Sequence, residues 1–234
     1  VMSTYSIYFS PTQGTKKVTN ALASAFEGYR EIELCKADDG STLPVFTEQD
    51  VCIIGAPAFG GRVPAFAIER IKKLEGNQAR AVLAAVYGNR AYEDTLIELY
   101  DTLKDCGFRC IGAVAAIAEH SIMRQFAAGR PDEQDITELE EFSKELSEKL
   151  AGPKGGEEIQ VPGNRPYKVF NGSPMKPFTT KACSNCGICV KACLAEAISS
   201  EAPYTTDPEK CFSCMRCIQV CPENARQVNP DMVN

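Results

Sequence analysis

The sequence predicts an α/β protein in two parts: a five-stranded parallel sheet with helices on both faces, followed by a small α+β domain rich in cysteine. Three observations lead to this prediction. Five short apolar segments alternate with amphipathic segments over the first 150 residues, as strands alternate with crossover helices. A Gly- and Pro-rich stretch follows. Eight of the 12 cysteines then lie between residues 183 and 221.

Length and composition fit this division. The chain of 234 residues has room for one domain of average size and a smaller one. A hydrophobic fraction of 44% with 24% charged residues excludes general disorder. No apolar run is long enough to cross a bilayer and no signal peptide is visible, so we expect a cytoplasmic protein without a membrane partner. The net charge of −6 argues against nucleic acid as a partner.

The strand candidates are short segments of mostly β-branched or apolar residues. They are Tyr5–Phe9, Glu31–Cys35, Val51–Gly55, Ala81–Tyr87 and Cys110–Ala118. Helical patterns cover about 15–30, 63–75, 92–106 and 133–150, whereas residues 36–50 lack one. Near-continuous apolar strands separated by helices predict a doubly wound parallel sheet over residues 1–151.

Residues 152–178 form the predicted linker. Five Gly and five Pro between Gly152 and Phe178 exclude a helix or a central strand. Aromatic and apolar side chains between the prolines, among them Tyr167 and Phe170, predict an extended strap that packs on another part of the molecule. The second domain then occupies residues 179–234.

The cysteines of this second domain form two runs with the same spacing, each a C-x2-C-x2-C-x3-C pattern. In two-cluster iron–sulfur proteins the first three cysteines of a run bind one cluster, and the fourth binds the other. We therefore predict one [4Fe-4S] cluster on Cys183, Cys186, Cys189 and Cys221, and a second on Cys193, Cys211, Cys214 and Cys217. A pair of zinc sites is the alternative, but it leaves the third cysteine of each run without a role.

Residues 179–230 resemble the bacterial two-cluster ferredoxins in this motif. Two positions depart from the pattern of that family. Leu194 stands where a proline usually follows the fourth cysteine of the first run. Met215 stands in the second run where the first run has the usual glycine, Gly187. All eight ligand positions are kept.

A hydroxyl-rich loop leads from the first strand into the first helix. Its candidate phosphate-binding residues are Ser10, Thr12, Gln13, Gly14 and Thr15. Hydroxyl groups and backbone N–H groups at a helix N-terminus favour an anion. The loop has neither a G-x-G-x-x-G nor a G-x-x-x-x-G-K-[ST] motif, so no dinucleotide fold or P-loop is predicted. A helix cap built from turn residues is the alternative interpretation.

Two further loops follow the third and fourth strands and meet the first at the carboxyl edge of the sheet, where doubly wound sheets bind ligands. Their candidate residues are Ala56, Pro57, Ala58, Phe59, Gly60 and Gly61 in one loop, and Gly88, Asn89, Arg90 and Tyr92 in the other. Residues 3–150 resemble flavodoxins in this arrangement, although Gln13 stands at a usual glycine. The resemblance implies FMN, with its phosphate in the first loop, its ring between the other two, and Phe59 as the stacking ring.

His120 follows the fifth strand at the same edge. It is either a proton donor to a reduced flavin or a histidine of the surface or of a domain contact. The four cysteines outside the two runs, Cys35, Cys52, Cys106 and Cys110, are expected to be buried and without chemistry.

The whole chain resembles the fusions of a flavodoxin-like protein with a two-cluster ferredoxin that occur in anaerobic bacteria and archaea. The resemblance implies FMN and two [4Fe-4S] clusters. Because clusters pass single electrons and flavin takes them one at a time and holds two, we expect an electron-transfer protein that exchanges electrons with a ferredoxin-type donor or acceptor. The long linker would also permit transfer between the subunits of a homodimer. No catalytic residue is identified. Two alternatives remain open: an FMN-dependent oxidoreductase that acts on a small substrate, and a non-catalytic redox sensor.

Overall fold

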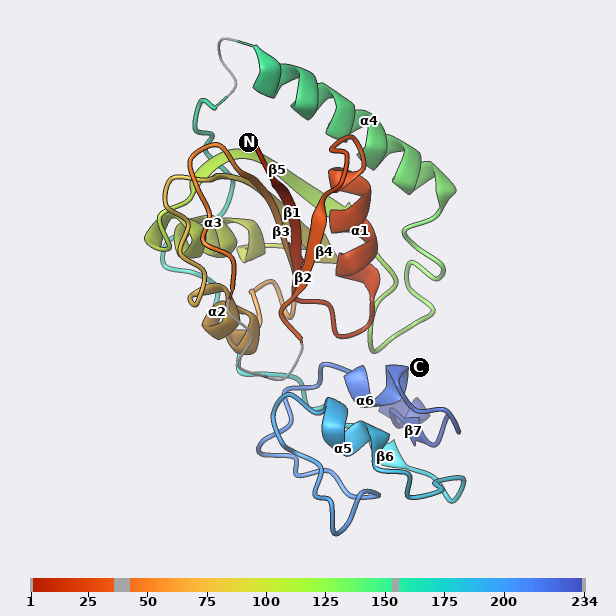
Figure 1. The fold of residues 1–234 in the computed structure, drawn as a ribbon. Coiled ribbons are helices and arrows are strands. Elements are labelled where there is room, and N and C mark those ends of the chain that lie inside the picture. The colour runs from red at the N-terminus through yellow and green to blue at the C-terminus, as the bar shows by residue number, and fades with distance from the viewer. Residues whose placement is uncertain (1, 36–42, 153–155, 233–234) are drawn as a thin grey trace.

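The computed structural model describes residues 2–35, 43–152 and 156–232, and its larger part is a five-stranded sheet (Figure 1). The strands are β1 (Thr4–Tyr8), β2 (Arg30–Glu33), β3 (Val51–Pro57), β4 (Arg80–Tyr87) and β5 (Arg109–Ile117). All neighbours pair in parallel in the order β2-β1-β3-β4-β5. This is the strand order of the flavodoxin-like doubly wound fold. The predicted fold class is confirmed.

Each face of the sheet carries its own hydrophobic core, because successive side chains of a strand point to opposite faces. Ile53 lies in one core and Ile54 in the other, and both are fully buried. Ile7 of β1 lies in register between Ile32 and Ile54, so the core that contains Ile54 extends across three strands. Buried apolar side chains on both faces explain why the strands read as continuous apolar runs.

Two helices cover each face (Figure 1). Helices α1 (Gly14–Ala23) and α4 (Glu133–Ala151) pack on the core that contains Ile53, and α2 (Ala65–Ile71) and α3 (Thr95–Asp105) pack on the other. The pattern at 15–30 predicted a longer first helix. The chain instead turns after Ala23, which carries Phe26 into the core before Gly28 adopts a φ of +70°.

The cysteine-rich part has little regular structure. It contains β6 (Phe178–Thr179) paired antiparallel with β7 (Arg226–Gln227), the short helices α5 (Ile188–Ala192) and α6 (Arg216–Gln219), and η1 (Pro230–Met232). Figure 1 shows this part below the sheet, at the edge where the strands end. Among the residues that the structure describes, no helix has the length and apolar character needed to cross a membrane.

Residues 156–177 are extended and run along α3 as a strap. Asp94 at the start of α3 accepts hydrogen bonds from the backbone N–H groups of Asn164 (2.8 Å) and Lys168 (2.7 Å). Two turns later, Asp101 accepts from the Arg165 guanidinium and from the Tyr167 hydroxyl. Residues 153–155 of the predicted linker lie outside the described part. Hydrogen bonds to α3 therefore hold the strap beside the sheet.

Candidate functional site

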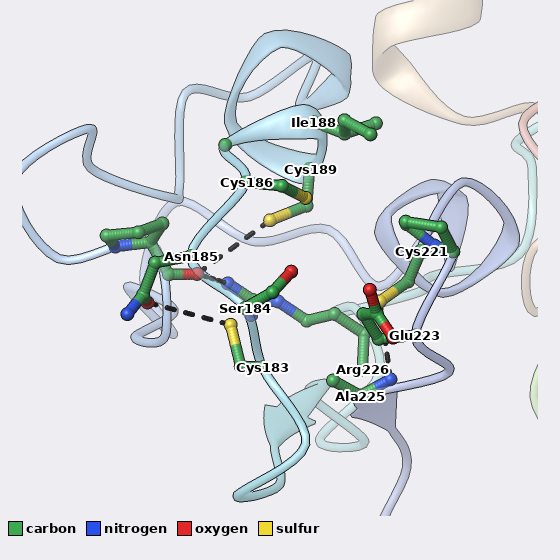
Figure 2. A pocket seen from close by; sticks show the side chains of 13 residues that line it. Cys183, Ser184, Asn185, Cys186, Ile188, Cys189, Cys221, Glu223, Ala225 and Arg226 are labelled. Atoms are coloured by element: carbon green, nitrogen blue, oxygen red, sulfur yellow. Dashed lines mark hydrogen bonds between the residues drawn. The ribbon is translucent and has the colours of Figure 1, made fainter.

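A pocket in the cysteine-rich part is lined by Cys183, Cys186, Cys189 and Cys221, among other residues (Figure 2). These are the four cysteines that the spacing assigned to one cluster, and Cys221 reaches the pocket from the second run. Three of their sulfurs have polar contacts: Cys183 Sγ with Asn185 Oδ1 at 3.7 Å, Cys189 Sγ with the Pro203 carbonyl at 3.8 Å, and Cys221 Sγ with the Ala225 N–H at 3.3 Å. The pocket can thus present four thiolates to one group.

The other four cysteines also lie close together. Burial raises the pKa of the Cys214 thiol to about 12, and the neighbouring Cys193 and Cys211 act in the same direction. Burial likewise raises the pKa of Cys217 to about 12. Thiols in such a place are protonated at neutral pH until a metal binds, because a metal deprotonates the thiol that it coordinates. Loading a cluster here therefore releases protons.

The two runs are repeats of one backbone structure, and equivalent residues are 28 positions apart. The backbone enters the left-handed region at the same three points of each run. The pairs are Asn185 and Ser213, Gly187 and Met215, and Glu196 and Asn224. Met215, with a φ of 61°, adopts the conformation that glycine holds in the first run, and its side chain is buried. The departure at Met215 thus leaves the turn intact.

The fourth cysteine of each run receives the same hydrogen bond. Ala197 N–H donates to Cys193 Sγ and Ala225 N–H donates to Cys221 Sγ, both at 3.3 Å. An N–H donor stabilises a thiolate, and such bonds adjust the reduction potential of an iron–sulfur cluster. Both groups of cysteines therefore fit a thiolate-bound cluster.

A single metal ion fits less well. Over the described residues, no three His, Cys, Asp or Glu side chains approach one another closely enough to hold one ion. Tetrahedral zinc needs four ligands around one atom, whereas a four-iron cluster places several atoms between its thiolates. The third cysteine of each run thus has a role in a cluster and none in a zinc site.

A cavity of about 560 Å³ lies at the carboxyl edge of the sheet. Many of the predicted flavin-binding residues line it: Thr12, Gly14, Thr15, Pro57, Ala58, Phe59, Gly60, Gly88, Asn89 and Arg90. The size is within the range of small-molecule sites. The loops after β1, β3 and β4 thus meet around one space.

Five of the predicted residues lie beside this cavity without lining it. Ser10 is buried, and its Oγ accepts from Lys16 N–H at 3.0 Å. Gln13 lines a smaller neighbouring cavity, and Ala56 is buried within β3. A side chain at Gly61 would collide with Glu93, so this glycine allows close packing. Tyr92 lies before α3, which begins at Thr95 and not at the predicted 92, and packs against Tyr87 and the core with the ring centroids 5.6 Å apart.

The phosphate loop has the geometry of an anion site. Gln13 adopts a φ of 72° immediately before α1, and its own side chain makes no cap hydrogen bond. The first N–H groups of a helix lack partners inside the helix. Ser10 Oγ accepts from that of Lys16, and those of Gly14 and Thr15 are available at the cavity wall. Lys16 points elsewhere and binds Glu31 at 2.8 Å.

Three further segments line the cavity, and of their residues the sequence analysis had singled out only His120 for this edge of the sheet. They are residues 118–123 with Phe126 after β5, the strap residues Phe170, Ser173 and Met175, and Phe212 and Ser213 from the second cysteine run. The first could have been inferred, since it follows a strand at the same edge. The other two come from parts distant in the sequence, and no local pattern indicates where they dock.

His120 lines the cavity in a fixed orientation. Its Nδ1 accepts hydrogen bonds from the N–H groups of Ile122 (3.2 Å) and Met123 (3.0 Å). A ring nitrogen that accepts carries no proton, so the imidazole is neutral with its hydrogen on Nε2. Burial, and next the positive charge of Arg90, lower the pKa of His120.

Comparison with known proteins identifies the cysteine-rich part. Residues 182–225 match the family described as 4Fe-4S dicluster domain. The chain is therefore an iron–sulfur protein with a domain for two [4Fe-4S] clusters. No curated protein matches the sequence.

Solved structures resemble the rest of the chain. A flavodoxin from the domain Archaea is 12% identical with a TM-score of 0.41, and the match covers 65% of this chain and all of that one. Flavodoxin 1 from Bacillus cereus is 14% identical, with a TM-score of 0.45 over 63% of this chain and 98% of that one. Rubredoxin oxygen:oxidoreductase from Desulfovibrio gigas is 20% identical, with a TM-score of 0.42 over 64% of this chain and 37% of that one. We assign the fold of the sheet from its strand order alone.

Proposed function

We propose that the chain is an electron-transfer flavoprotein in which two [4Fe-4S] clusters exchange electrons with FMN in the large cavity. The observation that carries this proposal is the composition of the cavity wall. The loops at the sheet edge and the second run of cluster cysteines line the same space. Clusters transfer single electrons and flavin accepts them, so neighbouring sites for both form an electron-transfer unit.

The residues have distinct parts in holding FMN. The N–H groups at the start of α1, with the hydroxyls of Thr12 and Thr15, would bind the phosphate. Phe59 and Gly60 on one side, and Gly88 on the other, would contact the flat ring. His120 would present its Nε2–H as a fixed hydrogen-bond donor.

The wall also favours a carrier over an oxidoreductase. Phe170 and Met175 of the strap and Phe212 of the dicluster domain add large apolar side chains to the cavity wall, which leaves less room for an organic substrate beside the flat ring. A redox protein needs no such access, because electrons pass through protein. We therefore propose redox proteins as the partners.

Cofactor analysis tests the proposal directly. Protein purified without oxygen should contain about eight iron, about eight sulfide and about one FMN per chain, because two four-iron sites and one flavin cavity are present. A low-potential ferredoxin should reduce clusters and flavin without NAD(P)H. Tightly bound zinc without sulfide would contradict the clusters. Rapid turnover of an organic acceptor with NAD(P)H alone would contradict the carrier.

A further inference from the structure

The two cysteine runs stand in different relations to the large cavity. Phe212 and Ser213, which lie between two cysteines of the second run, line it. Met215, Ile218 and Gln219 of the same run line the adjoining smaller cavity together with the phosphate loop. The pocket of the first run is lined entirely by residues 183–226, inside the dicluster domain (Figure 2).

Specific contacts hold the second run against the sheet. The ring of Phe212 stacks on Phe66 of α2 with the centroids 4.4 Å apart and lies 6.4 Å from Phe59. Arg216 binds Glu33 at 3.2 Å, and both side chains are largely buried. Aromatic stacking and a shielded ion pair fix this run in one orientation.

The first run faces outward. Cys186 is exposed, and Ile188 beside it is 42% exposed. Tyr204, next to the Pro203 that lines the same pocket, is 56% exposed. An apolar surface around an exposed cysteine gives an external protein close access to the group that this pocket holds.

We propose that the two clusters act in a fixed order. The inner cluster, on Cys193, Cys211, Cys214 and Cys217, exchanges electrons with the ligand of the large cavity, and the outer cluster, on Cys183, Cys186, Cys189 and Cys221, exchanges them with an external one-electron carrier protein. This order rests on the proposed function. Each carrier gives up one electron and is oxidised; FMN is reduced by two electrons and takes two protons from water, so two carriers are oxidised per flavin.

The single histidine of the chain offers a measurement of proximity that needs no turnover. His120 lines the large cavity, and a reduced [4Fe-4S] cluster is paramagnetic and broadens the NMR signals of nearby nuclei. Cys186→Ala removes a ligand of the outer cluster only, and Cys214→Ala removes one of the inner cluster only. Reduction by dithionite should broaden the His120 imidazole signals in C186A protein and leave them narrow in C214A protein. Equal broadening, or the reverse, would overturn the order.

A second pair of variants keeps all cysteines, in case a cluster variant does not assemble. Phe212→Ala should raise the FMN dissociation constant about two- to tenfold, from the loss of one aromatic contact, and slow flavin reduction by a ferredoxin. Phe178→Ala, which removes an exposed ring of the same domain, should change neither. An unchanged FMN dissociation constant and an unchanged rate of flavin reduction in F212A protein would overturn the proposed order. Wild-type protein without FMN or sulfide would instead disprove the proposed function.

Discussion

His120 is the side chain whose protonation the structure defines most closely. Two backbone N–H groups point at its Nδ1, and a protonated Nδ1 would face both of them. The cost of that encounter adds to the burial and the nearby Arg90 that lower the pKa. The residue therefore behaves as a neutral hydrogen-bond donor at physiological pH. Of the two roles that the sequence left open, a place beside the ligand is favoured, because His120 lines the cavity. A neutral imidazole that keeps its Nε2 hydrogen is a donor of a hydrogen bond and not a source of a proton.

We predict that NMR titration of His120 will give a pKa below the ordinary value of about 6.5 and an Nε2–H tautomer. A histidine whose pKa is lowered by folding binds fewer protons in the folded state. Its contribution to stability is therefore complete above the unfolded pKa and declines as the pH falls below it. Because the chain has one histidine, its imidazole signals need no assignment. A titration at or above 6.5 would contradict the geometry.

Residue identity predicted the chemistry of the sites better than it predicted their walls. The cysteine spacing alone grouped the eight thiols into the two sets that the structure brings together. Phe59 lines the cavity as expected, whereas Tyr92, in the loop before α3, packs on Tyr87 instead. Whether a side chain faces a ligand depends on the path of the loop that carries it, which the local sequence leaves undetermined.

At the scale of elements, the strap depends on the acidic face of α3. Asp94 is 2% exposed and accepts from the N–H groups of Asn164 and Lys168 and from the Asn164 amide. The Lys168 N–H first, and the Asn164 donors next, lower the pKa of Asp94. Arg62 adds a bidentate pair with Glu98 and donates to the Lys168 carbonyl. One helix thus places the strap residues that line the cavity.

Asp94→Ala should release the strap. Three donors lose their acceptor, which should lower the free energy of unfolding by about 1–3 kcal/mol and speed proteolysis within residues 156–177. Asp105→Ala at the exposed end of the same helix is the matched control and should change neither. Acid should reproduce the effect in wild-type protein. A carboxylate whose pKa is lowered by folding stabilises the fold fully above its unfolded-state pKa, and this stabilisation is lost as the pH falls through its folded-state pKa. Equal proteolysis of both variants would contradict the proposal that Asp94 holds the strap.

The elements themselves were largely predictable. Each observed strand begins within a residue of its prediction, since β-branched runs between helical patterns leave little choice. The end of α1 could not be predicted, because no helix-stop signal precedes Ala23. The chain turns there so that Phe26 can pack in the core. The path of the strap also depends on Asp94 and Asp101, acidic residues that read as ordinary helix surface.

The whole molecule joins two parts with different sources of stability. The sheet has two extensive cores, one on each face. Among the described residues, the dicluster domain buries six hydrophobic side chains, Cys189, Ala197, Ile198, Met215, Cys217 and Ala225, and two of the six are predicted cluster ligands. A domain of this size with so small a core needs metal to fold. The sequence indicated both parts, but their mutual orientation depends on contacts such as Arg216 with Glu33.

Removing the iron should therefore unfold one part and spare the other. We predict that chelation under mild acid, followed by return to neutral pH, will abolish hydrogen-exchange protection in residues 178–227 while β1 and β3–β5 stay protected, because the sheet cores contain no cluster ligand. Removal of FMN alone is the control and should leave protection in both parts. Reconstitution with iron and sulfide should restore residues 178–227. Persistent protection of those residues in the iron-free chain would show that the domain folds on its own packing.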